Sequence, residues 1–161
     1  MEKINKLKKF LRSKKIDGYI VPKNDEYFGE YITNHKDRLK YISNFTGSYG
    51  FALILNENNY LFVDGRYTLQ ANKQSGKFFK IKTIPHELPA HVLKNKKLKI
   101  GFDPKLFTKK TLNIFFGKTN CEYIPLNKNL VDIIWRRKRN NVKNKFYTLP
   151  LSSVGENYKI K

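Results

Sequence analysis

Three histidines, His35, His86 and His91, are the first residues to consider for metal chemistry. Two histidines four positions apart would place both imidazoles on one helical face, as many zinc sites require. The two nearest here are five apart, and the acidic residues are scattered, with Asp25-Glu26 as the only adjacent pair. Isolated histidines of this kind are usually solvent-facing or hydrogen-bonded structural groups. The sequence therefore predicts no metal ligand in this chain.

Catalytic nucleophiles and phosphate-binding loops are also not predicted. Cys121 is the one cysteine and has no thiol partner, and a buried free cysteine usually serves as packing. The nearest approach to a Gly-x-Ser-x-Gly elbow is Thr46-Gly47-Ser48-Tyr49-Gly50, whose flanking order is wrong. Gly117-Lys118-Thr119 matches the end of a Walker A motif, but Leu112 stands where its first glycine belongs. The tripeptide instead follows a predicted helix and is interpreted as its C-terminal stop.

Two short stretches remain as candidates for a functional site. In Phe45–Gly50, glycines and small hydroxyl residues precede a predicted buried strand, which suits a tight turn with close backbone approach. In Asp64–Tyr67, an acid, a glycine and an arginine follow the second strand of a predicted hairpin. The structural interpretation is a strand-to-helix junction in which Asp64 caps the helix and Arg66 pairs with a carboxylate. The functional interpretation is that Arg66 lines a ligand site or a domain interface.

The residue pattern around these stretches predicts alternating helices and strands. The apolar runs Tyr49–Leu55 and Tyr60–Val63 flank a polar turn of hairpin length. Helices are predicted over 2–15, 35–45, 64–74, 86–95, 108–117 and 129–135, and strands over 19–21, 49–55, 60–63, 78–84, 97–102 and 121–124. The alternation predicts an α/β fold with a mixed β-sheet flanked by helices.

Residues 1–135 are predicted to form one domain. After Trp135 the periodic pattern stops, and Arg136–Lys161 is basic, Asn-rich and poor in apolar residues. This segment is interpreted as a basic linker or tail that leads toward a next domain. We expect it to be poorly ordered on its own.

The composition limits the possible partners. The 161 residues include 33 Lys and Arg against 13 Asp and Glu, a net charge of +20. Of these cations 27 are Lys and only 6 are Arg, and the chain also has 17 Asn, a joint excess typical of A-rich codons. Surfaces selected to bind phosphate usually favour Arg, whose planar fork binds oxyanions bidentately. The charge is therefore only weak evidence for a nucleic-acid partner, which we do not expect, and only the basic run from Arg136 to Lys145 keeps that option open.

The location of the protein follows from three further features. The longest apolar runs, such as Phe51–Leu55, are far shorter than the roughly 20 residues of a membrane span. The charged amino terminus does not resemble a signal peptide. A single cysteine excludes an intrachain disulfide and suits a reducing compartment. We expect a cytoplasmic protein with no membrane partner.

Five segments follow one another in a distinctive order and spacing. They are Asp17-Gly18-Tyr19-Ile20-Val21-Pro22, Asp25-Glu26-Tyr27, Glu30-Tyr31-Ile32, Arg38-Leu39-Lys40-Tyr41-Ile42-Ser43-Asn44-Phe45-Thr46-Gly47-Ser48-Tyr49-Gly50 and Leu61-Phe62-Val63-Asp64-Gly65-Arg66-Tyr67, with Gln70-Ala71 after them. In this order they resemble the amino-terminal domain of aminopeptidase P, the Xaa-Pro aminopeptidases of the creatinase/prolidase superfamily. The resemblance covers about residues 1–135.

The resemblance implies a fold and a chemistry. Such enzymes cut the bond before proline with two divalent metals, often manganese, held by two Asp, one His and two Glu in a carboxy-terminal "pita-bread" domain. The amino-terminal domain is non-catalytic, takes part in oligomer contacts and walls the substrate entrance. By this resemblance the residues expected at a substrate mouth or a domain interface are Arg38, Thr46, Gly47, Ser48, Gly50, Asp64, Gly65, Arg66 and Tyr67.

Three functions stay open at this point. The first is a truncated, non-catalytic amino-terminal domain of an Xaa-Pro aminopeptidase, inactive alone and holding no cofactor itself. The second is one half of a split enzyme that reassembles with a separate pita-bread chain. The third is a basic domain that binds nucleic acid or an anionic surface, with an affinity that falls steeply with salt. Apolar area left exposed where another domain would dock favours self-association.

Overall fold

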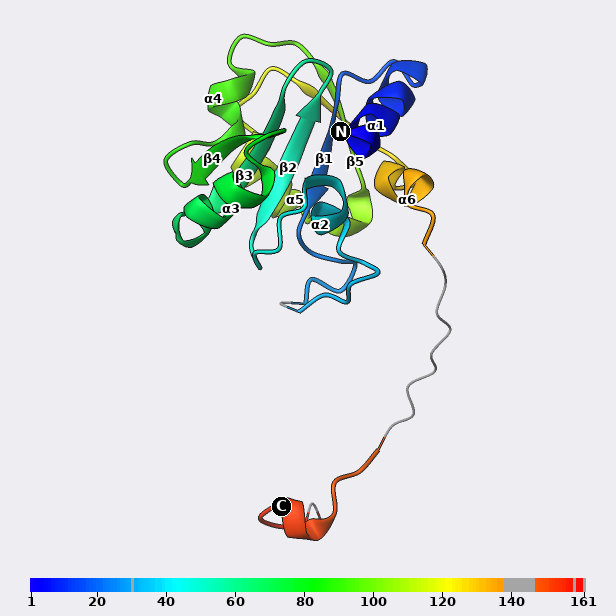
Figure 1. The fold of residues 1–161 in the computed structure, drawn as a ribbon, viewed down its shortest axis with the longest axis vertical. Coiled ribbons are helices and arrows are strands. Elements are labelled where there is room, and N and C mark those ends of the chain that lie inside the picture. Colours follow the sequence, from blue (N-terminus) through cyan, green and yellow to red (C-terminus); the bar gives the residue numbers. More distant parts are fainter. Residues whose placement is uncertain (30, 138–146, 158, 161) are drawn as a thin grey trace.

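The computed structural model describes residues 1–29, 31–137, 147–157 and 159–160. It shows a six-stranded mixed sheet with helices on both faces (Figure 1), which confirms the predicted fold class. The helices are α1 (Glu2–Ser13), α2 (Arg38–Ser43), α3 (Thr68–Ser75), α4 (Pro89–Leu93), α5 (Lys109–Phe116) and α6 (Leu130–Ile134), with 3-10 turns η1 (Gly65–Tyr67), η2 (Pro104–Leu106) and η3 (Leu151–Ser153). The strands are β1 (Gly18–Pro22), β2 (Gly50–Leu55), β3 (Asn59–Asp64), β4 (Lys80–Ile84), β5 (Lys99–Phe102) and β6 (Glu122–Pro125).

The sheet has the strand order β4-β3-β2-β1-β5-β6. The central strand β2 runs antiparallel to both neighbours, with Gly50 opposite Val63 of β3 and Phe51 opposite Pro22 of β1. The outer pairs β3–β4, β1–β5 and β5–β6 are parallel. The end of β1, the start of β2 and the end of β3 therefore meet at one edge of the sheet, an edge formed by strand ends and distinct from the outer strands β4 and β6.

Most predicted elements are confirmed, and the differences have local causes. The first helix ends at Ser13, short of Lys15, which has a left-handed φ of 55°. The helix expected over 64–74 begins with the 3-10 turn η1. The helix expected over 86–95 is reduced to α4, because Pro89 occupies its first turn and Asn95 beyond it has a φ of 60°.

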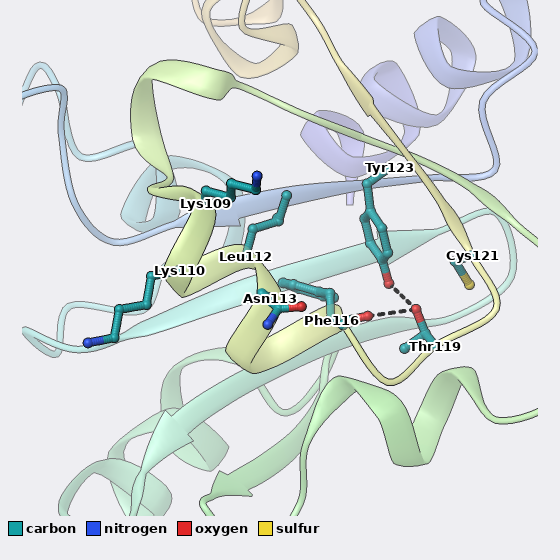
Figure 2. A pocket seen from close by; sticks show the side chains of 9 residues that line it. Lys109, Lys110, Leu112, Asn113, Phe116, Thr119, Cys121 and Tyr123 are labelled. Atoms are coloured by element: carbon teal, nitrogen blue, oxygen red, sulfur yellow. Dashed lines mark hydrogen bonds between the residues drawn. The ribbon is translucent and has the colours of Figure 1, made fainter.

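One face of the sheet packs against α4 and α5 (Figure 2). Strand alternation points Phe51 and Phe62 toward this face, where their rings stack with centroids 4.9 Å apart. Phe115 and Phe116 of α5 lie 5.0 and 5.8 Å from the ring of Phe51. The predicted cap of α5 is confirmed, since Thr108 Oγ1 accepts a hydrogen bond from the Thr111 amide.

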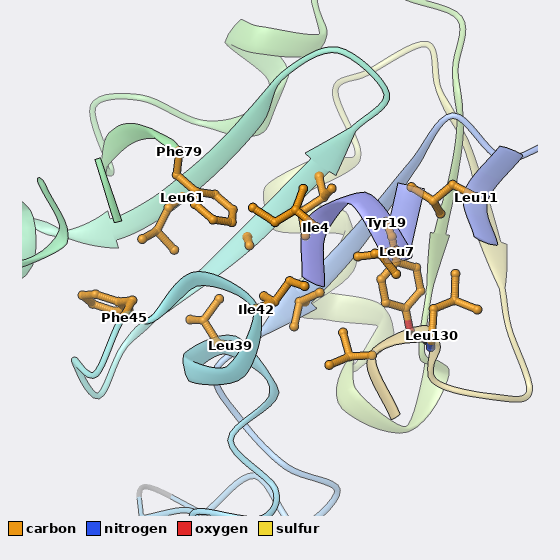
Figure 3. Close-up of a cluster of buried hydrophobic side chains, with 14 of the residues drawn as sticks. Ile4, Leu7, Leu11, Tyr19, Leu39, Ile42, Phe45, Leu61, Phe79 and Leu130 are labelled. Carbon is orange, nitrogen blue, oxygen red and sulfur yellow. Dashed lines mark hydrogen bonds between the residues drawn. The ribbon is translucent and has the colours of Figure 1, made fainter. Parts of the chain in front are cut away.

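The opposite face is covered by α1, α2, α3 and α6 (Figure 3). Leu7 and Leu11 of α1 are fully buried there, as the helical spacing predicts. Tyr19 of β1 is also buried, and its hydroxyl accepts a hydrogen bond from the Leu130 amide at 3.3 Å. Burial raises the pKa of Tyr19 well above its ordinary value. The core therefore ties α6, near the end of the domain, to the first strand.

The segment after Trp135 is described only in part. The interpretation of Arg136–Lys161 as a poorly ordered tail falls largely on residues 138–146, which lie outside the described residues. The described stretch 147–157 contains η3. Across the described ranges, no helix combines the length and the apolar content needed to cross a bilayer.

Candidate functional site

Two turns meet at the sheet edge where β2 begins and β3 ends. We call the residues Thr46–Gly50 and Asp64–Tyr67 together the two-turn surface. The antiparallel pairing of Gly50 with Val63 brings these segments side by side. The hydroxyls of Ser48 and Tyr67 are hydrogen-bonded at 2.8 Å. Eight of the nine predicted site residues therefore lie close together in space.

Two aromatic rings pack closely around Gly47 in the first turn. The ring of Tyr67 contacts that of Phe45 edge-on, with centroids 5.9 Å apart. A Cβ atom on Gly47 would lie 2.3 Å from Phe45 Cζ and 2.9 Å from Tyr67 Cδ1. No larger residue fits this position without displacing an aromatic ring, so Gly47 is required by the close approach of side chains, whereas the sequence predicted a close approach of backbone.

Thr46 is held by two glutamines that sequence reasoning missed. Its backbone amide donates to Gln74 Oε1 at 3.0 Å, and its hydroxyl accepts from Gln70 Nε2 at 2.8 Å and Gln74 Nε2 at 2.9 Å. Both side chains come from α3, four positions apart on one helical face. That spacing is readable in the sequence, but nothing in it indicates that the turn 28 residues earlier is the partner.

Asp64 and Arg66 form an exposed ion pair. Asp64 Oδ1 accepts from the Arg66 amide at 2.8 Å and from its Nε at 2.9 Å, and Oδ2 accepts from Nη2 at 3.1 Å. The hydrogen bond from the Arg66 side chain lowers the pKa of Asp64. These contacts confirm the structural interpretation, a capping Asp64 with Arg66 paired to a carboxylate. The Arg66 side chain is 73% exposed, and a role at an interface stays a prediction.

Arg38 has its contacts elsewhere, inside the domain. It is buried at the start of α2, where Nε and Nη2 donate to the two carboxylate oxygens of Asp132 in α6 at 2.9 and 2.8 Å. Nη2 also donates to Glu26 Oε1 at 2.7 Å. Arg137 donates to Asp132 as well. We call these four residues the Arg38 cluster. It fastens α2 to α6 and to the loop after β1.

Aromatic side chains project from the same edge of the sheet. The loop after β1 starts beside the two-turn surface, since the Lys23 amide donates to the Gly50 carbonyl at 3.0 Å. This loop exposes 82% of Tyr27 and 90% of Tyr31, and Tyr49 of the first turn is 47% exposed. Figure 1 shows the loop and α2 at one end of the domain. Exposed large aromatic side chains are typical of contact surfaces.

The Arg38 cluster predicts a stability change in acid. Burial alone would raise the pKa of Glu26, but hydrogen bonds, including those from Lys36 and Arg38, outweigh it and lower the pKa from 4.5 to about 2. Ionised Glu26 therefore stabilises the folded state above pH 4.5, and this contribution is lost as the pH falls from 4.5 toward 2. Urea midpoints at pH 6, 4, 3 and 2.5 should fall less steeply for Glu26→Gln than for the parent chain. Parallel pH profiles would contradict the assignment.

The part of the chain that the structure describes does not offer the donors of a dinuclear metal centre. Such a centre needs several carboxylates and imidazoles converging on one point. The described residues contain no group of three or more His, Cys, Asp or Glu placed to hold a metal ion.

The fold and the two-turn surface define an α/β domain whose candidate residues lie on turns at one edge of a mixed sheet. Residues 3–131 match the creatinase/prolidase N-terminal domain, and the chain belongs to this family. The resemblance seen in the sequence is thereby confirmed.

Curated relatives are much longer than this chain. A protein of Coprinopsis cinerea named "Probable Xaa-Pro aminopeptidase P" is 34% identical over 142 residues, which cover 83% of this chain and 23% of that protein. The Xaa-Pro aminopeptidase ApepP of Drosophila melanogaster is 32% identical over 150 residues, which cover 87% of this chain and 24% of that protein. The chain spans about a quarter of the length of the curated relatives it matches.

Solved structures agree with the family. The X-prolyl aminopeptidase of Caenorhabditis elegans, described as a cytosolic enzyme with a di-nuclear active site, matches with a TM-score of 0.73 and 27% identity over 83% of this chain and 25% of that chain. The N-terminal domain of the cytoplasmic peptidase PepQ from Mycobacterium tuberculosis matches with a TM-score of 0.64 and 20% identity over 83% of this chain and 98% of that chain. The second likeness concerns the fold alone.

Proposed function

We propose that this chain is the non-catalytic N-terminal domain of an Xaa-Pro aminopeptidase-like metallopeptidase, a cytoplasmic enzyme that removes an N-terminal residue preceding proline. The supporting observation is the coverage: relatives with that name align with most of this chain but with only about a quarter of their own length. The described residues also lack a metal-binding group, so the metals would be held outside them.

The two-turn surface is the part of the domain proposed to face the catalytic region. Two observations support this placement. Thr46 and Ser48 are exposed in the first turn, which Gln70 and Gln74 hold by hydrogen bonds to Thr46, and Arg66 is exposed in the second turn. Tyr49 of the first turn and two tyrosines of the loop after β1 are exposed as well. A rigid surface that combines polar groups with exposed rings loses little conformational entropy when it is covered by another domain.

A second possibility is that the catalytic region is a separate chain that reassembles with this one. The same surface would then be an interface between two proteins. Interfaces between such subunits bury at least about 1,200 Å², and exposed aromatic residues supply much of their binding energy. The two possibilities share the surface and differ in whether the two parts are covalently joined.

Activity measurements test the proposal. We expect this chain alone, given Mn²⁺ and an Xaa-Pro peptide, to show no turnover. A chimera in which this chain replaces the matching quarter of the C. elegans enzyme should hydrolyse the peptide, and the same enzyme lacking that quarter should not. Turnover by the chain alone, or a folded chimera without activity, would contradict the proposal. Activity on mixing this chain with the shortened enzyme would select the two-chain form.

Interface variants of the chimera localise the contact. Tyr49→Asp places a charge on the two-turn surface and should lower kcat/KM by about tenfold or more, because a buried interface charge is costly. Ile114→Asp is the matched control, since Ile114 is 59% exposed on α5, outside the two-turn surface. Equal losses for the two variants would show that another face contacts the catalytic region.

A further inference from the structure

The sheet ends at β6 with an open edge. β6 pairs with β5 on one side, and no strand of the described part of the chain lies beyond it. The Glu122 amide donates to Leu98 and the Leu126 amide to Phe102, both at 2.9 Å, which directs alternate residues toward β5. The N–H and C=O groups of Tyr123, in between, therefore point away from the sheet. Such an edge can accept a short further strand through the N–H and C=O of Tyr123 and the C=O of Pro125, which has no N–H to donate.

A groove lies beside this edge on the face covered by α5 (Figure 2). Its volume is about 810 Å³. Leu112 and Phe116 of α5 line it, together with Cys121 and Tyr123. Tyr123 is fixed by a hydrogen bond of 2.6 Å between its hydroxyl and Thr119 Oγ1, and its ring lies 5.3 Å from that of Phe116. The edge strand thus has a preformed apolar groove alongside it.

The groove has a positive rim. Lys109 and Lys110 of α5 line it, and Figure 2 shows the end of the Lys109 side chain near Leu112 and Lys110 reaching outward from the helix. Residues 104–121 contain four lysines and no acidic residue. Glu122 does not offset this charge, because neighbouring residues of a strand point to opposite faces and Tyr123 faces α5. A ligand for this groove should therefore be acidic.

We propose that the groove between α5 and β6 binds an extended, acidic segment of a partner protein, which adds to β6 as a seventh strand. Its backbone would pair with Tyr123, an apolar side chain would occupy the groove over Phe116, and acidic side chains would contact Lys109 and Lys110. A second copy of this chain is disfavoured as the occupant, because two chains of charge +20 repel each other. This proposal is independent of the proposed peptidase function.

Fluorescence anisotropy tests the proposal with a labelled eight-residue peptide that has Glu, Val, Glu and Phe at alternate positions and Thr between them, so that the acidic and apolar side chains share one face. We expect saturable binding to the full chain at 150 mM salt. Lys109→Glu with Lys110→Glu should weaken binding by about tenfold or more. Lys9→Glu with Lys73→Glu, an equal charge change on exposed lysines of α1 and α3, should change it less than about twofold. Equal losses in the two pairs would mean non-specific attraction and overturn the proposal.

Modified peptides test the strand addition without altering the protein. N-methylation of alternate peptide amides in one register removes the donors that face β6, whereas methylation in the other register leaves them intact. One methylated peptide should bind at least about tenfold more weakly than the other. NMR shift changes should fall on residues 109–123. Similar affinities for both methylated peptides, or a dimer of the chain that excludes the peptide, would overturn the proposal.

Discussion

Arg38→Met is expected to lower the free energy of unfolding by about 2–4 kcal/mol, one of the two largest effects foreseen for this domain. The guanidinium is 5% exposed and binds the carboxylates of Asp132 and Glu26. Removing a buried cation leaves its carboxylate partners with less compensation for their lost hydration. The loss stays below the upper limit for a buried pair because both carboxylates are 29% exposed and keep Arg137 and Lys36 as partners.

Arg66→Met is the matched control for this prediction. It removes the same group from an ion pair whose arginine is 73% exposed, so the expected loss is at most about 1 kcal/mol. Urea unfolding followed by the fluorescence of Trp135, at pH 7 and 150 mM salt, gives both values from the midpoints. Similar losses for the two variants would show that Arg38 does not act as an internal clamp.

The contrast between Arg38 and Arg66 shows what the sequence can predict about a site. Both arginines follow an Asp by one or two positions, and both were assigned to one surface. Arg66 pairs with Asp64, two residues before it, and the sequence predicts pairing with a nearby carboxylate. The main partner of Arg38 lies 94 residues away in α6, and only the folded chain shows that pairing. Burial of a charged residue depends on tertiary contacts that residue type and spacing do not contain.

The fold was predictable to a similar degree. Apolar runs, polar turns and capping residues such as Thr108 and Asp64 located the elements, because these signals act within a few residues. The order of the strands in the sheet could not be predicted from the sequence. β1 pairs with β5, across about 80 residues, and β6 is left at the edge, where the groove forms. The pairing of Thr46 with Gln74 was missed for the same reason, since it also depends on contacts distant in sequence.

Gly50→Ala is the second substitution expected to have a large effect, a loss of about 2–4 kcal/mol in unfolding free energy. Gly50 has a φ of 155°, which residues with a side chain rarely adopt. A Cβ atom there would lie 2.7 Å from the Phe62 carbonyl oxygen and 3.3 Å from Val63 Cγ1. The first contact is with backbone of β3, so relief requires moving the strand pairing that holds the two turns together.

Gly65→Ala, in the other turn of the two-turn surface, is the matched control. It distinguishes the steric effect expected at Gly50 from the general effect of replacing a glycine by alanine. The nearest atom to its Cβ position is Thr83 Cγ2 at 3.8 Å, an ordinary contact. The expected change in unfolding free energy is within about 0.5 kcal/mol, because a compatible Gly→Ala change mainly restricts the unfolded chain.

Urea midpoints give the unfolding free energies of both variants, and amide exchange shows which strands each substitution destabilises. Protection should fall in β2 and β3 for Gly50→Ala alone, since only that substitution forces the two strands apart. Equal midpoints would mean that the Gly50 backbone tolerates a side chain, and the close approach of the two turns would then not depend on glycine.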